Sequence, residues 1–458
     1  MALTEQLAQL IVSTSYEQLP AAAVTQAKRA FLDTIGVTLA GHREEAGRLI
    51  TAWVKEAGGC QEATVLGTDL CTSPALAALA NGTLGHALDF DDVTAHMRGH
   101  PSVPVLPVAL ALGEALGASG TEVITAYVLG VEVEAKLGKA MGSALPRHGW
   151  HPTAVLGTFG AAAAAAKLLG LDVQQTQMAL GIAASKAAGL RRNFGTMTKP
   201  LHAGEAARGG LEAAQLAQRG FSADPEILEG RFSFFTTFVG EGECKPEAAV
   251  EDFGQPYEIV SPGLGVKPYP SCRQTHRAID AMLALVQAHG LKPEAVSEIV
   301  CQCSAVLLDF LIHHRPTTGL QGKFSMEYCL AAALVYGRLG LEQFTDASVQ
   351  DPRVQALIPR VRLEHPDAER PDWEGKQADV VEVVLHDGRR LRQRVEVPKG
   401  DPQQPLTWEE LVAKFRDCTT SLLSEAQVAA AVEQIAHLEE LAALPSLLDN
   451  LTPAQALV

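Results

Sequence analysis

Residues 81–107 read NGTLGHALDFDDVTAHMRGHPSVPVLP, and this stretch concentrates ionisable side chains within an otherwise apolar chain. It contains three histidines, three aspartates and one arginine, whereas the sequence on either side is rich in alanine and leucine. Ionisable groups in an apolar setting are costly to bury unless they are paired or used in chemistry. The stretch is therefore either a functional loop or a solvent-exposed loop between helices, and its residues alone leave both interpretations open.

The glycine and prolines in the second half of this stretch exclude one continuous helix, because proline lacks the N–H that a helix interior requires. We predict a helix that ends near Asp92, a shaped loop that carries His96 to His100, and a new helix from about Pro107. Loops held by a rigid scaffold are common positions for catalytic groups.

The composition limits the function classes that the chain can belong to. Its 458 residues are 47% hydrophobic and only 5% aromatic, which favours packed helices of alanine, leucine and valine. The formal net charge of -16 argues against nucleic-acid binding and against binding to an anionic membrane. A small anionic substrate remains possible, but it would need a local cluster of arginine, lysine and histidine.

The cysteines and the N-terminus indicate a cytoplasmic protein. The eight cysteines are scattered and form no C-x-x-C pair, so we expect reduced thiols. The first 20 residues resemble an amphipathic helix, without the basic start and the cleavage site of a signal peptide. No run of 18 uninterrupted apolar residues occurs, so we expect no membrane association.

The periodicity of the chain changes twice and predicts two domains. Alanine-rich helical patterns fill the first half and return near the C-terminus, whereas residues 378–397 read as a hairpin of two β-branched runs around Asp387-Gly388. We predict a mainly α fold. Its large all-helical domain is discontinuous and comprises residues 1–263 and 403–458, and a smaller α+β domain of residues 264–402 is inserted between them.

The sequence predicts neither a nucleotide cofactor nor a catalytic metal. The segment GTFGAAAAAAKLLG, residues 157–170, lacks the G-K-[ST] ending of a phosphate-binding loop, and we expect a close helix crossing there. His96 and His100 are four residues apart, but Gly99 and Pro101 make a regular helix improbable, and no H-E-x-x-H motif occurs. The cysteine spacing also argues against an iron–sulfur cluster.

Four further stretches combine cations and proton carriers in settings bounded by glycine and proline. They are PRHGWHPT (146–153), GLRRNFGTMTKPLHAG (189–204), KPYPSCRQTH (267–276) and GKFSMEYC (322–329). Arginine and lysine neutralise carboxylates, and a histidine near its operating pH exchanges a proton. A site for a small polycarboxylate needs both kinds of group. Two histidines have a structural alternative: His86 fits a core position on an apolar helix, and His202 is equally compatible with a packing role.

Six motifs, taken in order and at their separations, resemble the MmgE/PrpD family over nearly the whole chain. They are HALDFDD (86–92), GHPSVPVLP (99–107), GWHPT (149–153), TKPLHAG (198–204), KPYPSCRQTH (267–276) and KFSMEY (323–328). The family includes 2-methylcitrate dehydratase, cis-aconitate decarboxylase and iminodisuccinate epimerase. The resemblance implies a helical large domain, a smaller α+β domain, a homodimer and chemistry without a cofactor.

The resemblance also carries over site residues, motif by motif. These residues are Asp89, His100, His151, Lys199, His276 and Tyr328. One departure concerns the residue directly after DFDD, which is threonine in many members and Val93 here, with Thr94 next. The strings MRGHPS and NFGTMTKP are closer to the epimerase-like branch, whereas Tyr328 fits the decarboxylase pattern better.

Each candidate residue has an expected role in the chemistry of a polycarboxylate. Arg98, Lys199 and Arg273, together with Lys323, are expected to bind carboxylates and to spread the charge that develops on the substrate. Because of this cation set, the expected partner is a small di- or tricarboxylate.

The proton carriers complete the predicted site. His100 or His151 would move the proton at the carbon next to a carboxylate, and Asp89 would orient a neighbouring histidine. Tyr328 would protonate a leaving hydroxyl or bind a substrate oxygen, and His276 is a catalytic candidate through the resemblance alone. We predict a cofactor-independent lyase and place a dehydratase similar to 2-methylcitrate dehydratase first. The alternatives are an epimerase of an iminodisuccinate-like dicarboxylate and a decarboxylase of the cis-aconitate type.

Overall fold

The computed structural model of the chain describes residues 1–366 and 377–453 and divides into two compact units. Unit 1 consists of residues 1–193, 197–266 and 407–458, and unit 2 consists of residues 194–196 and 267–406. The fold is mainly helical with a small α+β part, which confirms the predicted fold class.

Unit 1 is built almost entirely from helices. Its helices are α1 (Leu3–Ser13), α2 (Ala21–Ala40), α3 (Glu45–Ala57), α4 (Pro74–Ala87), α5 (Ser102–Leu116), α6 (Gly120–Met141), α7 (Ala144–Arg147), α8 (Pro152–Leu168), α9 (Val173–Lys186), α10 (Thr198–Gln218), α11 (Phe234–Val239), α17 (Trp408–Thr419), α18 (Glu425–Ala436) and α19 (Pro445–Asn450). A two-stranded ribbon, β1 (Ala63–Thr64) with β2 (Cys71–Thr72), is antiparallel.

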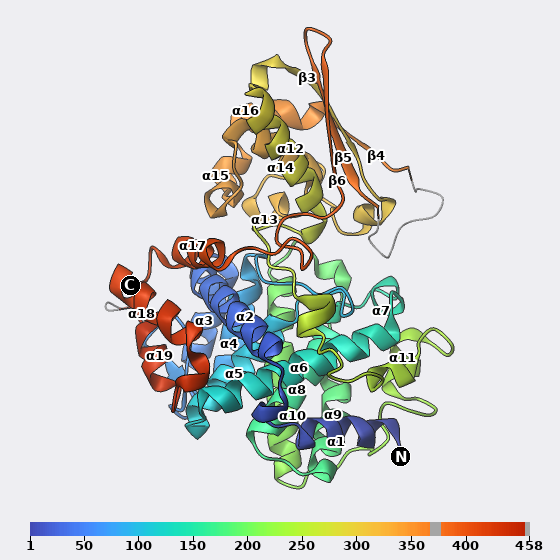
Figure 1. Cartoon of the computed structure of the whole chain (residues 1–458), viewed down its shortest axis with the longest axis vertical. Coiled ribbons are helices and arrows are strands. Elements are labelled where there is room, and N and C mark those ends of the chain that lie inside the picture. Colours follow the sequence, from blue (N-terminus) through green and yellow to red (C-terminus); the bar gives the residue numbers. More distant parts are fainter. Residues whose placement is uncertain (367–376, 454–458) are drawn as a thin grey trace. The chain divides into compact units, whose positions relative to one another are not determined.

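Helices α4, α5, α6, α8 and α10 pack against one another in unit 1 (Figure 1). Their small residues allow close approach. A Cβ atom on Gly82 of α4 would lie 2.9 Å from the Cα atom of Gly204 on α10, so any larger residue would push the two helices apart. The crossing lies about one turn from His86 on α4 and from Lys199 on α10, which brings the chemistry-bearing parts of both helices together.

The helix boundaries around the opening stretch differ from the prediction. Helix α4 ends at Ala87 rather than near Asp92, and α5 begins at Ser102 rather than at about Pro107. The Asp92 carboxylate accepts hydrogen bonds from the backbone N–H of Ser102 at 3.2 Å and from its hydroxyl at 2.5 Å, which anchors the start of α5. Pro104 lies in the first turn, where a helix needs no N–H donor, and the helix continues through Pro107.

Unit 2 contains one four-stranded sheet covered by helices. The strands are β3 (Val296–Gln302), β4 (Val361–Glu364), β5 (Asp379–Leu385) and β6 (Arg390–Val395), in the order β4-β3-β5-β6. Only the β3–β4 pair is parallel among the four described strands. Strands β5 and β6 form the predicted hairpin, and Gly388 in its turn has a φ of 86°. The helices are α12 (His276–His289), α13 (Gly319–Gly322), α14 (Met326–Tyr336), α15 (Asp346–Val349) and α16 (Pro352–Leu357).

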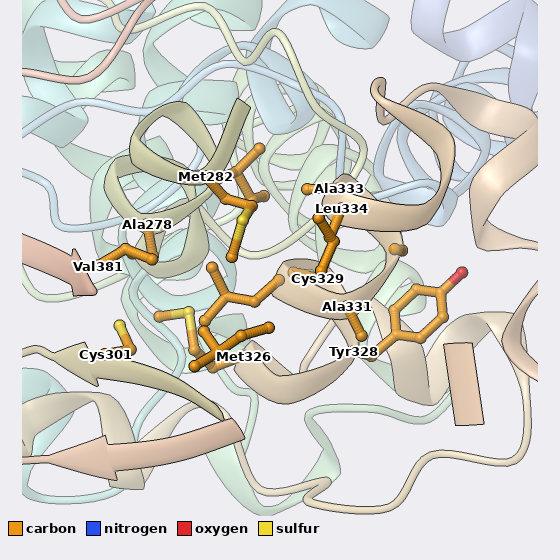
Figure 2. Close-up of a cluster of buried hydrophobic side chains, with 14 of the residues drawn as sticks. Ala278, Met282, Cys301, Met326, Tyr328, Cys329, Ala331, Ala333, Leu334 and Val381 are labelled. Carbon is orange, nitrogen blue, oxygen red and sulfur yellow. The ribbon is translucent and has the colours of Figure 1, made fainter. Parts of the chain in front are cut away.

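The core of unit 2 lies between its sheet and the helices α12 and α14. Figure 2 shows Met282 from α12 and Met326 from α14 together with Cys301 from β3 and Val381 from β5. Tyr328 belongs to the same buried cluster. These side chains come from sequence-distant segments, so the sheet and the two helices stabilise each other by burying apolar surface.

Candidate active site

The chain turns sharply at Asp89, directly after the end of α4. Asp89 has a φ of 51°, in the left-handed region that few residues other than glycine adopt. Arg98, near the end of the following loop, has a φ of 56°. Within this loop the N–H of Thr94 donates a hydrogen bond to the Gly99 carbonyl at 3.1 Å, and the N–H of Arg98 donates to the Thr94 carbonyl at 3.0 Å. Unusual backbone conformations of this kind are frequent at functional sites, where the surroundings hold them in place.

Asp91 lies between two histidines, one from α4 and one from the loop. Its carboxylate lies 2.9 Å from Nδ1 of His86 and 2.9 Å from Nδ1 of His100. The imidazole rings of His86 and His100 meet edge to face, with centroids 4.5 Å apart. The backbone N–H of His100 also donates to the hydroxyl of Thr153 on α8 at 3.0 Å. The loop and two helices therefore hold His100 in position.

Asp89 lies on the other side of His100. Its carboxylate oxygen is 3.5 Å from Nε2 of His100 and accepts a hydrogen bond from the Lys199 ammonium at 2.9 Å. Lys199 lies in the first turn of α10, and its side chain is only 6% exposed. His100 thus has a carboxylate near each ring nitrogen, and it can carry a second proton without leaving the positive charge unpaired.

A second pair of histidines adjoins this group. His151 directly precedes α8, its ring stacks on His86 with centroids 5.8 Å apart, and its backbone N–H donates to the Gly189 carbonyl. Its Nδ1 lies 3.1 Å from Nδ1 of His202 on α10. We call His86, Asp89, Asp91, His100, His151, Lys199 and His202 the histidine–aspartate cluster.

Burial keeps most of these imidazoles neutral. It lowers the pKa of His86 to about 3, although Asp91 opposes the shift. Burial also lowers the pKa of His151 well below its usual range, and the charge of Lys199 acts in the same direction. At neutral pH His86 is therefore a neutral ring whose Nδ1–H donates to the Asp91 carboxylate.

Asp91 and Asp92 are both buried, but their pKa values shift in opposite directions. Burial by itself raises the pKa of Asp91, but His100 and His86 outweigh it and hold that pKa well below its usual range. Burial raises the pKa of Asp92 to about 7, and the nearby Asp33 and Asp91 add to this shift. Asp91 is thus ionised among the histidines, whereas Asp92 is partly protonated at neutral pH and bonds to Ser102.

Four of the predicted site residues lie in this cluster, and a fifth lies in the adjoining loop. Asp89, His100, His151 and Lys199 interact within unit 1, and Arg98 is half-buried in the loop that leads to His100. The roles assigned to them stay predictions.

The other four predicted residues belong to unit 2, where local contacts hold three of them. His276 Nε2 donates to the Ser271 carbonyl at 3.2 Å, and Arg273 forms an ion pair with Asp401 at 2.9 Å. The Tyr328 hydroxyl donates to the Gln343 carbonyl. The fourth, Lys323, is fully buried. Their roles in chemistry also stay predictions.

Sequence reasoning left three members of the cluster outside the predicted site, namely His86, Asp91 and His202, for which a packing role had been equally compatible. Asp91 was quoted within DFDD without a role, and His86 was expected to be a core histidine. His86 is indeed buried, yet it also bonds to Asp91, five residues further along the chain. A buried histidine that is closely followed by several aspartates was the available signal, because such a ring needs a polar partner.

The donor set could also surround a cation. The ligand atoms of His86, Asp89, Asp91 and His100 lie within 4.8 Å of one another. However, the Asp89 carboxylate already contacts the Lys199 ammonium, and the Asp91 carboxylate contacts two imidazoles, so the negative charges have partners within the protein. The predicted absence of a metal stays a prediction, and activity after exhaustive chelation tests it. Separately, no helix in the described parts of the chain combines the length and the apolar character needed to cross a membrane.

The chain matches proteins of one known family over most of its length. The family model for the MmgE/PrpD N-terminal domain matches residues 5–247, and the model for the MmgE/PrpD C-terminal domain matches residues 269–440. Cis-aconitate decarboxylase from Mus musculus is 31% identical over 455 residues, which cover 96% of this chain and 91% of the relative. Cis-aconitate decarboxylase from Aspergillus terreus (strain NIH 2624 / FGSC A1156) is 28% identical, over 95% and 93% of the two chains. 2-Methylcitrate dehydratase from Escherichia coli (strain K12) is 24% identical over 379 residues, with 77% and 76% covered.

Proposed function

Because the chain belongs to the MmgE/PrpD family, we propose that it is a lyase that moves a proton at the carbon next to a carboxylate of a small di- or tricarboxylate. The observation that carries this proposal is the position of His100, with Asp91 near Nδ1 and Asp89 near Nε2. An imidazole with a carboxylate near each ring nitrogen is suited to deliver a proton to a developing carbanion.

Two other members of the cluster complete the chemistry. The Lys199 ammonium, held by Asp89, binds a substrate carboxylate and stabilises the negative charge that develops in the transition state. His151 stacks on His86 and contacts His202 within the cluster, so we assign it as the second proton carrier, which in its neutral form accepts a proton from a carbon acid.

Decarboxylation of cis-aconitate is the first reaction to test. The comparisons support it, because the decarboxylases match this chain at higher identity and over more of its length than the dehydratase does. In this reaction the bond to one carboxylate breaks, its electron pair stays on the carbon skeleton as a delocalised carbanion, and carbon dioxide leaves. His100 then donates a proton to the skeleton.

Dehydration, the reaction that the sequence placed first, is the second candidate. It needs a base for the C–H proton and an acid for the departing hydroxyl. His151 and His100 offer both within the cluster, which supports this alternative. Epimerisation of an iminodisuccinate-like compound needs two proton carriers on opposite faces of the carbon and is a further alternative.

Proton NMR in deuterated water distinguishes these reactions. The purified protein is incubated separately with cis-aconitate, 2-methylcitrate, citrate and iminodisuccinate. A new pair of vinyl signals from cis-aconitate, with deuterium in the product, supports decarboxylation, whereas a new alkene from 2-methylcitrate supports dehydration. Deuterium at a stereocentre without a new alkene would replace the lyase by an epimerase. Silence with all four compounds contradicts the proposed substrate class.

We also propose that the protein forms a homodimer and works without a metal. Light scattering coupled to size-exclusion chromatography measures the mass against the 48.5 kDa of one chain. Activity that is lost after chelation and restored by zinc or iron would contradict metal independence.

A further inference from the structure

One turn of α10 supplies two functional groups to the cluster, and the proposed function uses only one of them. Lys199 and His202 are three residues apart, so they lie on the same face of the helix. The Lys199 ammonium contacts Asp89, whereas His202 Nδ1 lies 3.1 Å from Nδ1 of His151. His151 is 2% exposed, but His202 is only partly buried and retains access to solvent.

A hydrogen bond between two Nδ1 atoms couples the protonation states of the two rings. Nδ1 donates when it carries a proton and accepts when it does not, so a hydrogen bond at this distance requires one shared proton. When His151 donates, its Nε2 carries a lone pair and is a base. When His202 donates, the Nε2 of neutral His151 carries a proton and is an acid. The first form becomes the second when three changes occur together: His151 Nε2 gains a proton, the Nδ1 proton of His151 moves to His202 Nδ1, and His202 Nε2 loses a proton.

The surroundings of His151 oppose a positive charge on its ring. Burial is the largest cause, and the Lys199 ammonium acts in the same direction. The nearest carboxylates of the cluster are engaged elsewhere, Asp89 by Lys199 and Asp91 by His86 and His100. Burial and the charge of Lys199 also lower the pKa of His202, to about 4. Of the two rings, the one with access to water can lose an added proton rapidly.

We propose that His202 is a positioning residue and a proton relay, which selects the tautomer of His151 and connects this buried base to solvent. The inference rests on the proposed function for its assignment of His151 as a base. In the step, the substrate C–H bond breaks and leaves its electron pair on carbon, while an N–H bond forms at His151 Nε2. The Nδ1–H bond of His151 breaks, and its proton moves to His202 Nδ1. His202 then releases its Nε2 proton to water, and delivery of a proton follows the reverse path.

Nitrogen NMR of histidine-labelled protein tests the tautomer without any substrate. The signals of His151 are assigned by their loss in His151→Gln, and its Nδ1 and Nε2 shifts are compared between the wild type and two variants. His202→Asn retains a short polar group near the position of Nδ1 and is expected to keep one dominant His151 tautomer. His202→Phe removes the partner, and we expect mixed tautomers. Unchanged His151 shifts in His202→Phe would overturn the positioning role.

Steady-state kinetics with an accepted substrate test the relay. We expect His202→Asn to lower kcat about tenfold or more with KM changed less than about twofold, because an amide holds the ring but carries no proton onward. We also expect a change in the pH profile of kcat. Added imidazole should partly restore kcat in His202→Ala. The control is His437→Asn, an exposed histidine at the end of α18, which should behave like the wild type.

The outcomes separate this inference from the proposed function. Wild-type kcat and pH profile in His202→Asn, or no rescue by imidazole in His202→Ala, would overturn the relay. If the wild type turns over none of the four compounds, the proposed function fails, and the NMR comparison still decides whether His202 sets the tautomer of His151.

Discussion

His86, Asp91 and His100 interact with one another in unit 1, whereas His276 and Tyr328 in unit 2 bond to main-chain carbonyls. His86, Asp91, His276 and Tyr328 are buried and the His100 side chain is only 12% exposed, so both sets need polar partners within the protein. Partners that are themselves ionisable form a network in which protons can be redistributed. Main-chain partners hold a side chain in one state and stabilise the local fold. The two regions therefore hold similar residue types for different physical reasons.

We expect the largest loss of activity when His100 in unit 1 is replaced. His100→Asn should lower kcat by about 10²–10⁴-fold, because it removes a proton carrier that two carboxylates orient. The matched variant in unit 2, His276→Asn, should lower kcat much less and should lower Tm, since it disturbs a buried hydrogen bond. Kinetics and thermal unfolding of both variants measure this difference. Equal losses of kcat would mean that His276 is catalytic, as the resemblance implied.

Lys199→Met should have the second-largest effect, on both KM and the free energy of unfolding. It leaves the Asp89 carboxylate buried without its ammonium partner, which costs about 3–5 kcal/mol for a buried ion pair. We expect a large increase in KM together with a lower free energy of unfolding. Lys186→Met is the control, because its pair with Glu212 is partly exposed and should contribute less than about 1 kcal/mol. Similar losses of stability in both variants would contradict the role of burial.

Asp92→Asn should change how stability depends on pH. The folded protein holds a proton on Asp92 up to a pKa of about 7, whereas the unfolded chain releases it near the ordinary value of 3.8. Between these values the folded state binds more protons, so Asp92 lowers stability as the pH rises, by up to about 1.4 kcal/mol per pH unit. Denaturant unfolding at pH 4.5 and pH 7.5 measures the free energy of unfolding of both proteins. Relative to the wild type, Asp92→Asn should be more stable at pH 7.5 than at pH 4.5. The exposed control Asp449→Asn should show no such gain.

The smallest effect is expected for Tyr328→Phe. Burial raises the pKa of Tyr328, so its hydroxyl is protonated and donates to the Gln343 carbonyl. Loss of this one bond should cost about 1–2 kcal/mol of stability and change kcat little. A fall of kcat by a hundredfold with unchanged stability would restore the role that the sequence assigned to this residue.

Much of the fold could be predicted from local patterns. The small, apolar residues of the first half predicted close-packed helices, and Asp387-Gly388 between two β-branched runs predicted the β5–β6 hairpin. The end of α4 was misplaced because the chain leaves the helix before Asp89, whose φ is 51°. The start of α5 was misplaced because the bond from Ser102 to Asp92 anchors it, which helical periodicity does not report. Proline alone did not mark the start of α5, since a proline in the first turn fits a helix.

The sequence by itself determined which residue types are present and on which motifs, and so it indicated the family and the polycarboxylate chemistry. Only the tertiary structure decided which partner each ionisable group has. Lys199 meets Asp89 across 110 positions of sequence, and His202 meets His151 across 51. Helical periodicity reports which face of a helix is buried, but the contacts of that face depend on how helices cross. Close packing at glycines such as Gly82 and Gly204 fixes that crossing, and with it the pairing of charges in the cluster.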